Sequence, residues 1–280
     1  MRCTKAIIPV AGYGARRLPI TKAIEKCMLP ILNRPLIDYV IQDCIQAGVK
    51  DIYIVVSVGG GQQIRQFYAK NEAIEAYLVA QHKDKLLPLV ASLRDDVRLH
   101  FVEQDTTQVY GTTVPVWLCR QFINPDEQVL VLMGDDFIYN SDGSSETKRL
   151  VEAAANGSAM IGVPLAKSEV SHYGVIATKE LQDGTKAFTH IQEKPTAEEA
   201  ASNLINVSKY IFDYAFFAFV EAAMATDASG GIEHLLTDPL NDYVNAGHSL
   251  RVLEARGEYL DSGTVENWLA ANQFVAQHTL

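Results

Sequence analysis

Short apolar runs recur along the first half of the chain, and they constrain the fold more than any other feature. Five runs are rich in valine and isoleucine and lack polar alternation, at residues 6–10, 52–56, 99–102, 129–133 and 160–163. Such runs are typical of parallel strands buried on both faces. Segments with helical spacing lie between several of them, at residues 36–47, 72–87 and 114–122. This alternation predicts a Rossmann-like, doubly wound α/β sheet whose ligands bind beyond the carboxyl ends of the strands.

The second half of the chain has a different pattern. Strand-like segments follow one another closely at residues 174–178, 187–193 and 206–212. Helical segments at 216–225 and 232–246 and a strand at 250–254 come after them. We therefore expect a mixed sheet with a smaller antiparallel β add-on that forms one side of a cleft. No linker-like tract separates the halves, so residues 1–280 are expected to form a single domain with halves 1–165 and 166–280.

Composition narrows the class of partner. The formal net charge of -10 would repel a nucleic-acid backbone, so no nucleic-acid partner is expected. The cysteines lie far apart, which argues against a zinc ribbon or a disulfide framework and favours a reducing cytoplasm: Cys3, Cys27, Cys44 and Cys119. The N-terminus lacks a signal-peptide pattern, and the apolar stretch 210–225 contains Asp213 and Glu221. We therefore expect no membrane partner and a cytoplasmic location.

A glycine-rich, basic loop follows the first strand. Residues 11–17 read AGYGARR, and glycines at a strand end, here Gly12 and Gly14, let backbone amides approach phosphate groups. Arg17 replaces the third glycine of the dinucleotide fingerprint, and the Gly-Lys-Ser/Thr of a P-loop is missing. Instead, four nearby cations suit a triphosphate that is gripped and then cleaved: Arg16, Arg17, Lys22 and Lys26. The alternative is a plain glycine turn with solvated cations.

Two carboxylates follow strand-like runs further along the chain. Asp135 comes after the apolar run at 129–133, and Asp261 comes after Tyr259 and Leu260. Each is a candidate magnesium ligand, because hard cations prefer oxygen donors and substrate phosphates. As alternatives, the Asp135-Asp136 pair suits a turn, and Asp261 suits a helix cap.

A third polar group closes the strand-like run at 187–193. Glu193 and Lys194 place a hydrogen-bond acceptor beside a cation. The acceptor suits sugar hydroxyls, and the lysine suits a phosphate as a point charge. Because Glu-Lys-Pro is a common tripeptide, this signal is weak by itself.

Taken in order, these motifs resemble the sugar nucleotidyltransferase family, and within it most closely the bacterial enzymes that use UTP and glucose 1-phosphate. The most specific part is AGYGARRLPITKAIEKCMLP, residues 11–30. Supporting motifs follow in the family's order: Gln104 with Gly111, Gly134-Asp135, Tyr173-Gly174-Val175, Glu193-Lys194-Pro195 and Asp261-Ser262-Gly263. The insertion at 71–93 resembles the one in uridylyltransferases and is not expected in the shorter thymidylyltransferases.

The resemblance implies a magnesium-assisted, in-line transfer of a uridylyl group from UTP to glucose 1-phosphate, with pyrophosphate leaving. It places the antiparallel add-on on the sugar side of the cleft, and we also expect a homo-oligomer. It implies these site residues: for the uracil, Ala11, Gly12, Gln104 and Gly111; for the nucleotide in general, Gly14; for the triphosphate, Arg16 and Lys26; for magnesium, Asp135 and Asp261; for glucose hydroxyls, Gly174 and Glu193; and for the glucose phosphate, Lys194.

The chain departs from the family's pattern at several positions. The usual Thr, Pro and Glu of the loop are replaced by Ala15, Glu25 and Cys27, and the residues around Gly111 differ at Gln108, Val109, Thr112 and Thr113. We expect Glu25, next to Lys26, to repel the triphosphate and weaken its binding. Two alternatives stay open: the same chemistry with another nucleotide or hexose phosphate, such as dTTP, and a weakly active regulatory relative that binds sugar nucleotides.

Overall fold

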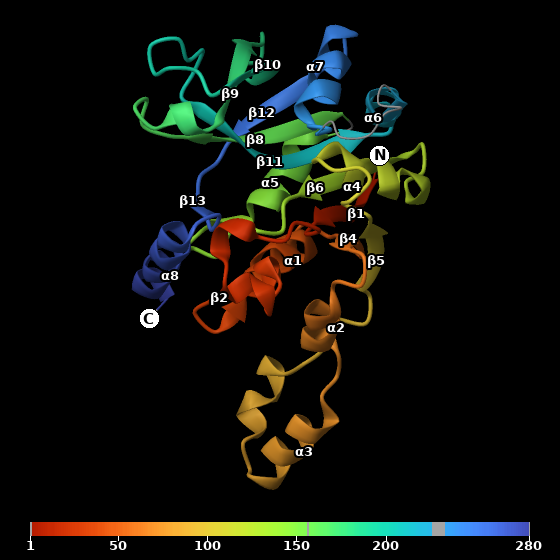
Figure 1. The fold of residues 1–280 in the computed structure, drawn as a ribbon, viewed down its shortest axis with the longest axis vertical. Helices are drawn as coiled ribbons and strands as arrows, with labels where there is room; N and C mark the ends of the chain where they lie inside the picture. The colour runs from red at the N-terminus through yellow and green to blue at the C-terminus, as the bar shows by residue number, and fades with distance from the viewer. Residues whose placement is uncertain (1, 156, 226–232, 280) are drawn as a thin grey trace.

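A mixed sheet runs through both halves of the chain (Figure 1). The structure is a computed structural model that describes residues 2–155, 157–225 and 233–279. Within these residues the sheet has nine strands in the order β5-β4-β1-β6-β11-β8-β12-β10-β9. In chain order they are β1 (Arg2–Pro9), β4 (Asp51–Ser57), β5 (Arg98–Gln104), β6 (Glu127–Leu132), β8 (Ser158–Pro164), β9 (Gly174–Glu180), β10 (Lys186–Glu193), β11 (Leu204–Asp213) and β12 (Leu250–Glu254).

Helices cover both faces of this sheet, as a doubly wound fold requires. Alternate residues of β1 show this, because Ile8 packs in one core cluster and Ile7 in the other. The Ile8 side is covered by α1 (Leu36–Gln46), α5 (Glu146–Ala154) and α8 (Val265–Thr279). The Ile7 side is covered by α4 (Thr113–Cys119), α6 (Phe216–Ala225) and α7 (Thr237–Asn245). The predicted fold class is confirmed.

The second half also contributes a central strand. β11 is antiparallel and lies between β6 and β8, whereas β9 and β10 extend the same sheet at its end. The sequence pattern grouped β11 with the add-on, and its position differs for a physical reason. Tyr210, Ile211 and Phe212 are all buried, so both faces of this strand are apolar and both need cover. Such a strand is stable in the middle of a sheet rather than at its edge.

Two helices differ from their predicted bounds. Residues 72–87 are not one helix, because α3 (Glu72–Ala80) ends before His82, whose φ of 54° is left-handed, and a 3-10 helix (Asp84–Leu89) follows. α7 begins at Thr237, with Pro239 in its first turn, where a missing backbone N–H costs no helical hydrogen bond. Its predicted start at residue 232 lies outside the described residues. The remaining short helix is α2 (Gln62–Tyr68).

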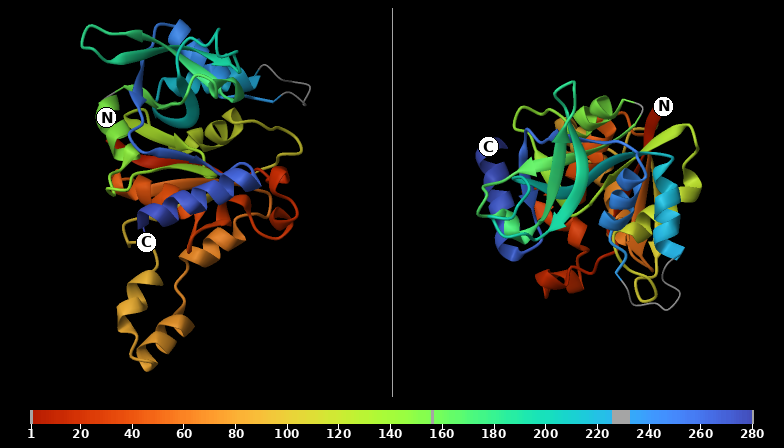
Figure 2. Two further views of the ribbon diagram at one scale, coloured as in Figure 1. Left: turned by 90° about the vertical axis from the view of Figure 1, so that its left-hand side faces the viewer. Right: turned by 90° about the horizontal axis from the view of Figure 1, so that it is seen from above.

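The insertion at 71–93 projects away from the body of the molecule (Figure 1; Figure 2). It carries α3 and exposes several large apolar side chains: Ile74, Tyr77, Val79, Leu86 and Leu89. The rest of the chain surrounds the sheet. In the described part of the chain, no helix combines the length and the hydropathy needed to cross a bilayer.

Two small antiparallel ribbons lie outside the main sheet. One joins β2 (Pro30–Ile31) to β3 (Arg34–Pro35), and the other joins β7 (Asp136–Tyr139) to β13 (Glu258–Asp261). The second ribbon starts one residue after Asp135 and ends at Asp261. It therefore connects the two predicted magnesium ligands, although they are 126 residues apart in the sequence.

Candidate active site

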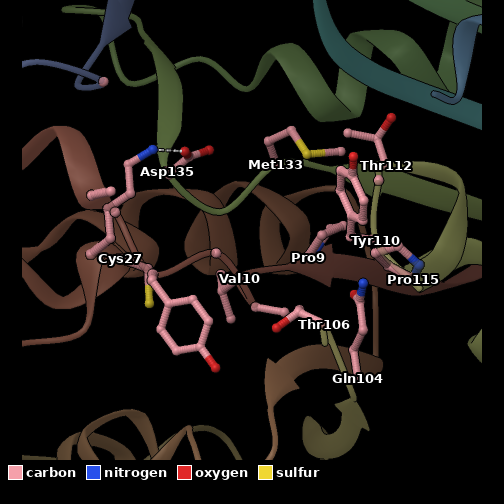
Figure 3. Close-up of a pocket in the computed structure, with 18 of the residues that line it drawn as sticks. Pro9, Val10, Cys27, Gln104, Thr106, Tyr110, Thr112, Pro115, Met133 and Asp135 are labelled. Carbon is pink, nitrogen blue, oxygen red and sulfur yellow. Dashed lines mark hydrogen bonds and ion pairs between the residues drawn. The ribbon is translucent and has the colours of Figure 1, made fainter. Parts of the chain in front are cut away.

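A cavity of about 460 Å³ lies beyond the carboxyl ends of β1, β5 and β6 (Figure 3). The loop after β1 forms one wall, and the segments after β5 and β6 form most of the rest, with Gly263 after β13. Eight of the predicted site residues line it: Ala11, Gly12, Gly14, Arg16, Lys26, Gln104, Gly111 and Asp135. The glycine-rich loop and the carboxylate after β6, which are far apart in sequence, thus meet in one place.

A lysine and a carboxylate face each other at one end of this cavity. Lys26 Nζ donates a hydrogen bond to Asp135 Oδ2, and the two groups form an ion pair (Figure 3). The loop folds tightly over the lysine, because Gly14 has a φ of 64° and a Cβ there would lie 3.1 Å from Lys26 Cβ. The Thr21 hydroxyl donates to the Gly14 carbonyl at 2.9 Å and fixes this turn. The arrangement offers one cation and one anion to an entering metal-bound phosphate.

Gln104, Tyr110 and Thr112 lie at the other end of the cavity (Figure 3). Gln104 is buried, and its Nε2 donates to the Val109 carbonyl at 3.4 Å. The side-chain carbonyl of Gln104 therefore keeps acceptor capacity for a ligand. A planar base that offers an N–H group matches this end of the cavity.

The loop at this end is anchored by residues 233–236. Thr113 N donates to the His234 carbonyl at 2.9 Å, and His234 N donates to the Tyr110 carbonyl at 3.0 Å. Gly111 lies between these contacts with a φ of 118°, and a Cβ there would stand 2.3 Å from the His234 oxygen. Only glycine fits this position, so the wall of the cavity depends on it.

The two neighbouring aspartates after β6 have different surroundings. Asp135 lines the cavity, whereas Asp136 is buried and forms an ion pair with Lys209 at 2.5 Å. Burial raises the pKa of Asp136 to about 6, and the charge of Lys209 opposes this shift. Asp136 thus has a structural partner, and Asp135 is the carboxylate of this pair that faces the cavity.

Asp261 lies at the end of β13, opposite Asp136 in the ribbon. Its Oδ1 accepts from Gly263 N at 2.7 Å, and its Oδ2 accepts from Asn267 Nδ2 at 2.8 Å. Thr264 caps the backbone of α8, because its hydroxyl accepts from Asn267 N at 3.1 Å. Thr264, and not Asp261, is therefore the residue that caps α8. Gly263, two residues after Asp261, lines the cavity.

The carboxylates of Asp135 and Asp261 fit a magnesium site that a phosphate ligand would complete. No group of three or more His, Cys, Asp or Glu side chains within residues 2–155, 157–225 and 233–279 gathers as a metal site. Magnesium often takes one or two carboxylates and fills its shell with water and substrate phosphates. Two carboxylates at the same end of one ribbon fit that mode of binding.

Arg17 and Lys22 do not line this cavity. Arg17 is 1% exposed, and its guanidinium nitrogens are buried with no hydrogen-bond partner. Burial lowers the pKa of Arg17, and the charges of Asp135 and Asp261 oppose that shift. Lys22 lines a smaller, adjoining cavity. The prediction that four loop cations grip one triphosphate is therefore wrong for Arg17, which is held inside the protein.

The carboxylate of Glu25 is directed to the start of α2. Its oxygens accept hydrogen bonds from Gly61 N at 3.1 Å and Gln63 N at 3.3 Å. Gln63 also joins the loop from its own side, because its Nε2 donates to the Ala23 carbonyl at 2.9 Å. Backbone amides of another segment therefore engage this carboxylate, which argues against a strong repulsion between Glu25 and a triphosphate.

The predicted sugar residues form a separate corner. Glu193 pairs with Gly174 across β9 and β10, and Lys194 N donates to the Tyr173 carbonyl at 3.1 Å. Lys194 has a φ of 44°, a strained conformation for a residue with a side chain. Burial raises the pKa of Tyr173, and the charge of Asp261 adds to the shift. These residues do not line the 460 Å³ cavity, but Tyr173 brings them near Asp261.

Sequence reasoning did not identify several residues of the site. Tyr110, Met133 and Pro115 line the cavity, and apolar residues of this kind give no distinctive sequence signal. Lys209 and Tyr259, which hold Asp136, were also missed. Lys209 did carry a signal, because it is the one charged residue in the run LINVSKYIF of β11. A lone charge in a buried strand requires a buried partner.

Comparisons with known proteins agree with this geometry. The nucleotidyl transferase family profile matches residues 5–278. A UTP-glucose-1-phosphate uridylyltransferase of Streptococcus pneumoniae is 33% identical, covering 92% of this chain and 85% of that protein. One of Pseudomonas aeruginosa is 30% identical, covering 98% and 96%. A solved structure of a UDP-glucose pyrophosphorylase complexed with UDP-glucose has a TM-score of 0.80 and 26% identity, covering 99% of both chains. The resemblance seen in the sequence is confirmed.

Proposed function

The chain belongs to the nucleotidyl transferase family, and we propose from this membership that it transfers a uridylyl group from UTP to glucose 1-phosphate, giving UDP-glucose and pyrophosphate. One observation in the cavity supports this proposal at the level of single residues. Asp135, which pairs with Lys26, lies at one end of the cavity, and Gln104 lies at the other (Figure 3). A nucleotide can therefore place its base at one end and its phosphates at the other.

Lys26 and Arg16 are the proposed phosphate-binding groups. When UTP binds, Lys26 exchanges Asp135 for phosphate oxygens, and this releases the carboxylate. Arg16 Nη2 lies 3.4 Å from the position of a Cβ on Gly263, so its guanidinium is next to the Asp261 turn. Cations fixed at this place stabilise the charge that develops on the bridging and leaving oxygens.

The acceptor phosphate needs no general base in this reaction. The second pKa of a phosphate monoester is about 6, so glucose 1-phosphate is largely a dianion at neutral pH. Lys194 is proposed to hold this phosphate, and Gly174 with Glu193 to contact the glucose hydroxyls. The role of the protein is to align the attacking oxygen with the α-phosphorus and with the leaving pyrophosphate.

Magnesium is the proposed cofactor, with Asp135 and Asp261 as its protein ligands. When bound, it would neutralise charge on the reacting phosphates and keep the donor and acceptor aligned. Ala11, Gly12 and Gly14 would then meet the nucleotide through backbone amides. The presence of Lys26 and Asp135, paired in the cavity, supports an active enzyme over a regulatory relative that has lost its phosphate-handling residues.

UTP is proposed as the preferred nucleotide, with dTTP as the competing choice. Residues 71–93, which suggested this preference, do not line the cavity, so they do not contact the base directly. Gln104 offers the same hydrogen bonds to uracil and thymine. The overall similarity to uridylyltransferases therefore supports UTP more than any single contact does.

Three further features remain proposals. A single domain for residues 1–280 is supported by β11, which joins the second half to the centre of the sheet. A homo-oligomer is supported by the apolar side chains exposed on the insertion 71–93, and light scattering would measure it. A cytoplasmic location is supported by free thiols at all four cysteines.

Pyrophosphate release is the direct test of the proposed reaction. Purified protein with magnesium would be given UTP, dTTP, ATP, CTP and GTP, each with glucose 1-phosphate and with other hexose phosphates. We expect the highest kcat/KM for UTP with glucose 1-phosphate. Equal values for UTP and dTTP would overturn the nucleotide assignment and leave the reaction class in place. No pyrophosphate with any pair would overturn the enzymatic function.

A further inference from the structure

A buried polar cluster lies beside the cavity and takes no part in the chemistry proposed above. Lys209 Nζ donates to Asp136 Oδ1 at 2.5 Å and lies 3.3 Å from the Asp136 carbonyl oxygen. The Tyr259 hydroxyl donates to Asp136 Oδ2 at 3.1 Å. Asp136 thus receives a hydrogen bond on each carboxylate oxygen, from β11 on one side and β13 on the other.

A bulge in β11 directs Lys209 to this position. The pairing of β11 with β8 shifts between Asn206 and Tyr210, and Ser208 has a left-handed φ of 51°. Asn206 Oδ1 fixes the bulge by accepting from Ser208 N at 3.0 Å and from the Tyr210 hydroxyl at 2.8 Å. Bulges commonly redirect a side chain next to an active site. Here the bulge brings a lysine into the interior beside Asp136.

The cluster residues are close in sequence to both predicted metal ligands. Asp135 immediately precedes Asp136, and Asp261 follows Tyr259 by two residues in β13. In the β7–β13 ribbon, Asp136 is also the register partner of Asp261. Any movement of β13 relative to β7 would therefore change the distance between Asp135 and Asp261, and the Tyr259–Asp136 bond resists that movement.

Burying an ion pair between strands costs desolvation free energy for both charges. Lys209 is 3% exposed, and well-packed apolar residues often replace such pairs with equal or greater stability. Apolar contacts are not directional, however, and would leave the alignment of β7 with β13 to the backbone pairing of this short ribbon alone. Hydrogen bonds from two sides set the orientation of the Asp136 backbone, and with it that of Asp135.

We propose that Lys209, Asp136 and Tyr259 are positioning residues that hold Asp135 and Asp261 at the separation required by one magnesium ion. This inference rests on the proposed function, because it assumes that these two aspartates bind magnesium with UTP. The cluster itself does not contact the metal or the substrates. Its effect is expected in the part of UTP affinity that depends on magnesium.

Calorimetric titration of UTP without glucose 1-phosphate measures this part directly, since no turnover occurs. The measured quantity is the ratio of the Kd for UTP without magnesium to the Kd with it. In Tyr259→Phe and Lys209→Met we expect this ratio to fall by about ten-fold, as for other residues that orient metal ligands. The Kd without magnesium should stay within about two-fold of the wild-type value, because the cavity walls are unchanged. Lys209→Arg, which keeps the charge, should recover part of the ratio.

Two matched controls separate positioning from a general loss of stability. Tyr243→Phe removes a buried hydroxyl that donates to Asp213 Oδ2 at 2.9 Å and does not line the cavity. Lys5→Met removes a lysine that pairs with Glu127 at 2.6 Å. Glu127 begins β6, so this pair lies at the other end of the strand from Asp135. Both controls should lose melting temperature and keep the wild-type magnesium ratio.

The outcomes distinguish this inference from the proposed function. A wild-type protein whose UTP affinity does not depend on magnesium would overturn the metal role and this inference together. A wild-type protein with that dependence, and a Tyr259→Phe variant that keeps the full ratio, would overturn the inference alone. If Lys209→Met fails to fold, Tyr259→Phe still decides, because it removes a single oxygen and leaves the ion pair in place.

Discussion

The nucleotide end and the sugar corner of this protein are built differently. The nucleotide end is a cavity whose walls are fixed by internal contacts, such as Thr21 with Gly14 and Thr113 with His234. The sugar corner lies on β9 and β10, at the end of the sheet, and its residues lie outside that cavity. The folded chain thus already contains the cavity proposed for UTP, whereas the residues proposed for glucose 1-phosphate lie outside that cavity. The two substrates should therefore respond to different substitutions.

Asp135→Asn is expected to have the largest effect. The substitution removes the negative charge that is proposed to bind magnesium, while it keeps the size of the side chain. We expect kcat to fall by about 10²- to 10³-fold, a loss of the size seen when one group that stabilises the transition state is removed. The measurement is steady-state pyrophosphate release at saturating substrates, with the melting temperature as a check of folding.

The matched control for that substitution is Asp142→Asn. Asp142 is an exposed turn residue that accepts from Ser144 N at 2.9 Å, away from the cavity. It should keep the wild-type kcat. Wild-type turnover in Asp135→Asn at ordinary magnesium concentrations would remove Asp135 from the site. The reacting phosphates could then no longer be placed at the nucleotide end of the cavity.

Lys194→Ala should separate the two regions. Its proposed partner is the phosphate of glucose 1-phosphate, and a hydrogen bond to a charged group contributes about 1.5–3 kcal/mol. We therefore expect the KM for glucose 1-phosphate to rise by about 10- to 150-fold, with the Kd for UTP unchanged. Lys186→Ala is the control, because Lys186 lies at the start of β10, the strand that ends just before Lys194, and pairs with Glu254 in an exposed ion pair. An equal loss of affinity for both substrates would place Lys194 in the nucleotide site.

Gly111→Ala should affect the opposite end. A Cβ at Gly111 would collide with the backbone of His234, so the loop that carries Tyr110 and Thr112 has to move. We expect the Kd for UTP to weaken by about 5- to 20-fold, with the KM for glucose 1-phosphate at saturating UTP kept. Gly143→Ala is the control, since Gly143 also has a positive φ, of 73°, but open space around it. Similar UTP affinities in both variants would show that the collision is relieved without moving the cavity wall.

The sequence predicted the parts of this site that depend on the chain's local order. Gly12, Gly14 and Asp135 follow apolar strands, and the carboxyl ends of parallel strands meet at one edge of a sheet. Local pattern therefore sufficed to bring them together. The resemblance to a family supplied Gln104 and Gly174, which have no distinctive local signal. The strands β1, β4, β6 and β8 were predictable for the same reason, because each contains a continuous apolar run.

The site residues that the sequence assigned wrongly or missed depend on which face of a loop each side chain occupies. The spacing of residues does not determine this. Arg16 and Arg17 are adjacent, yet Arg16 lines the cavity and Arg17 is buried. Asp135 and Asp136 divide in the same way. The central position of β11 and the partner of Lys209 required knowledge of which strands pair, which is a property of the whole sheet. Non-local pairing is the information that a local pattern lacks.

Glu25→Gln should have the smallest effect on UTP, and the structure reverses the expectation from sequence. A carboxylate beside Lys26 would repel a triphosphate if both faced the cavity, but the oxygens of Glu25 accept from Gly61 N and Gln63 N at the start of α2. A negative charge at that position also suits the helix dipole. We therefore expect the Kd for UTP at low ionic strength to stay within about two-fold, and stability to fall by about 0.5–1 kcal/mol, as for loss of a capping charge. Calorimetry and thermal unfolding measure the two quantities.

Glu266→Gln is the control for the charge change, because Glu266 is in the first turn of α8 and does not line the cavity. Tightening of UTP binding by Glu25→Gln of about three-fold or more, absent from Glu266→Gln, would mean that the Glu25 carboxylate faces the phosphates when UTP is bound.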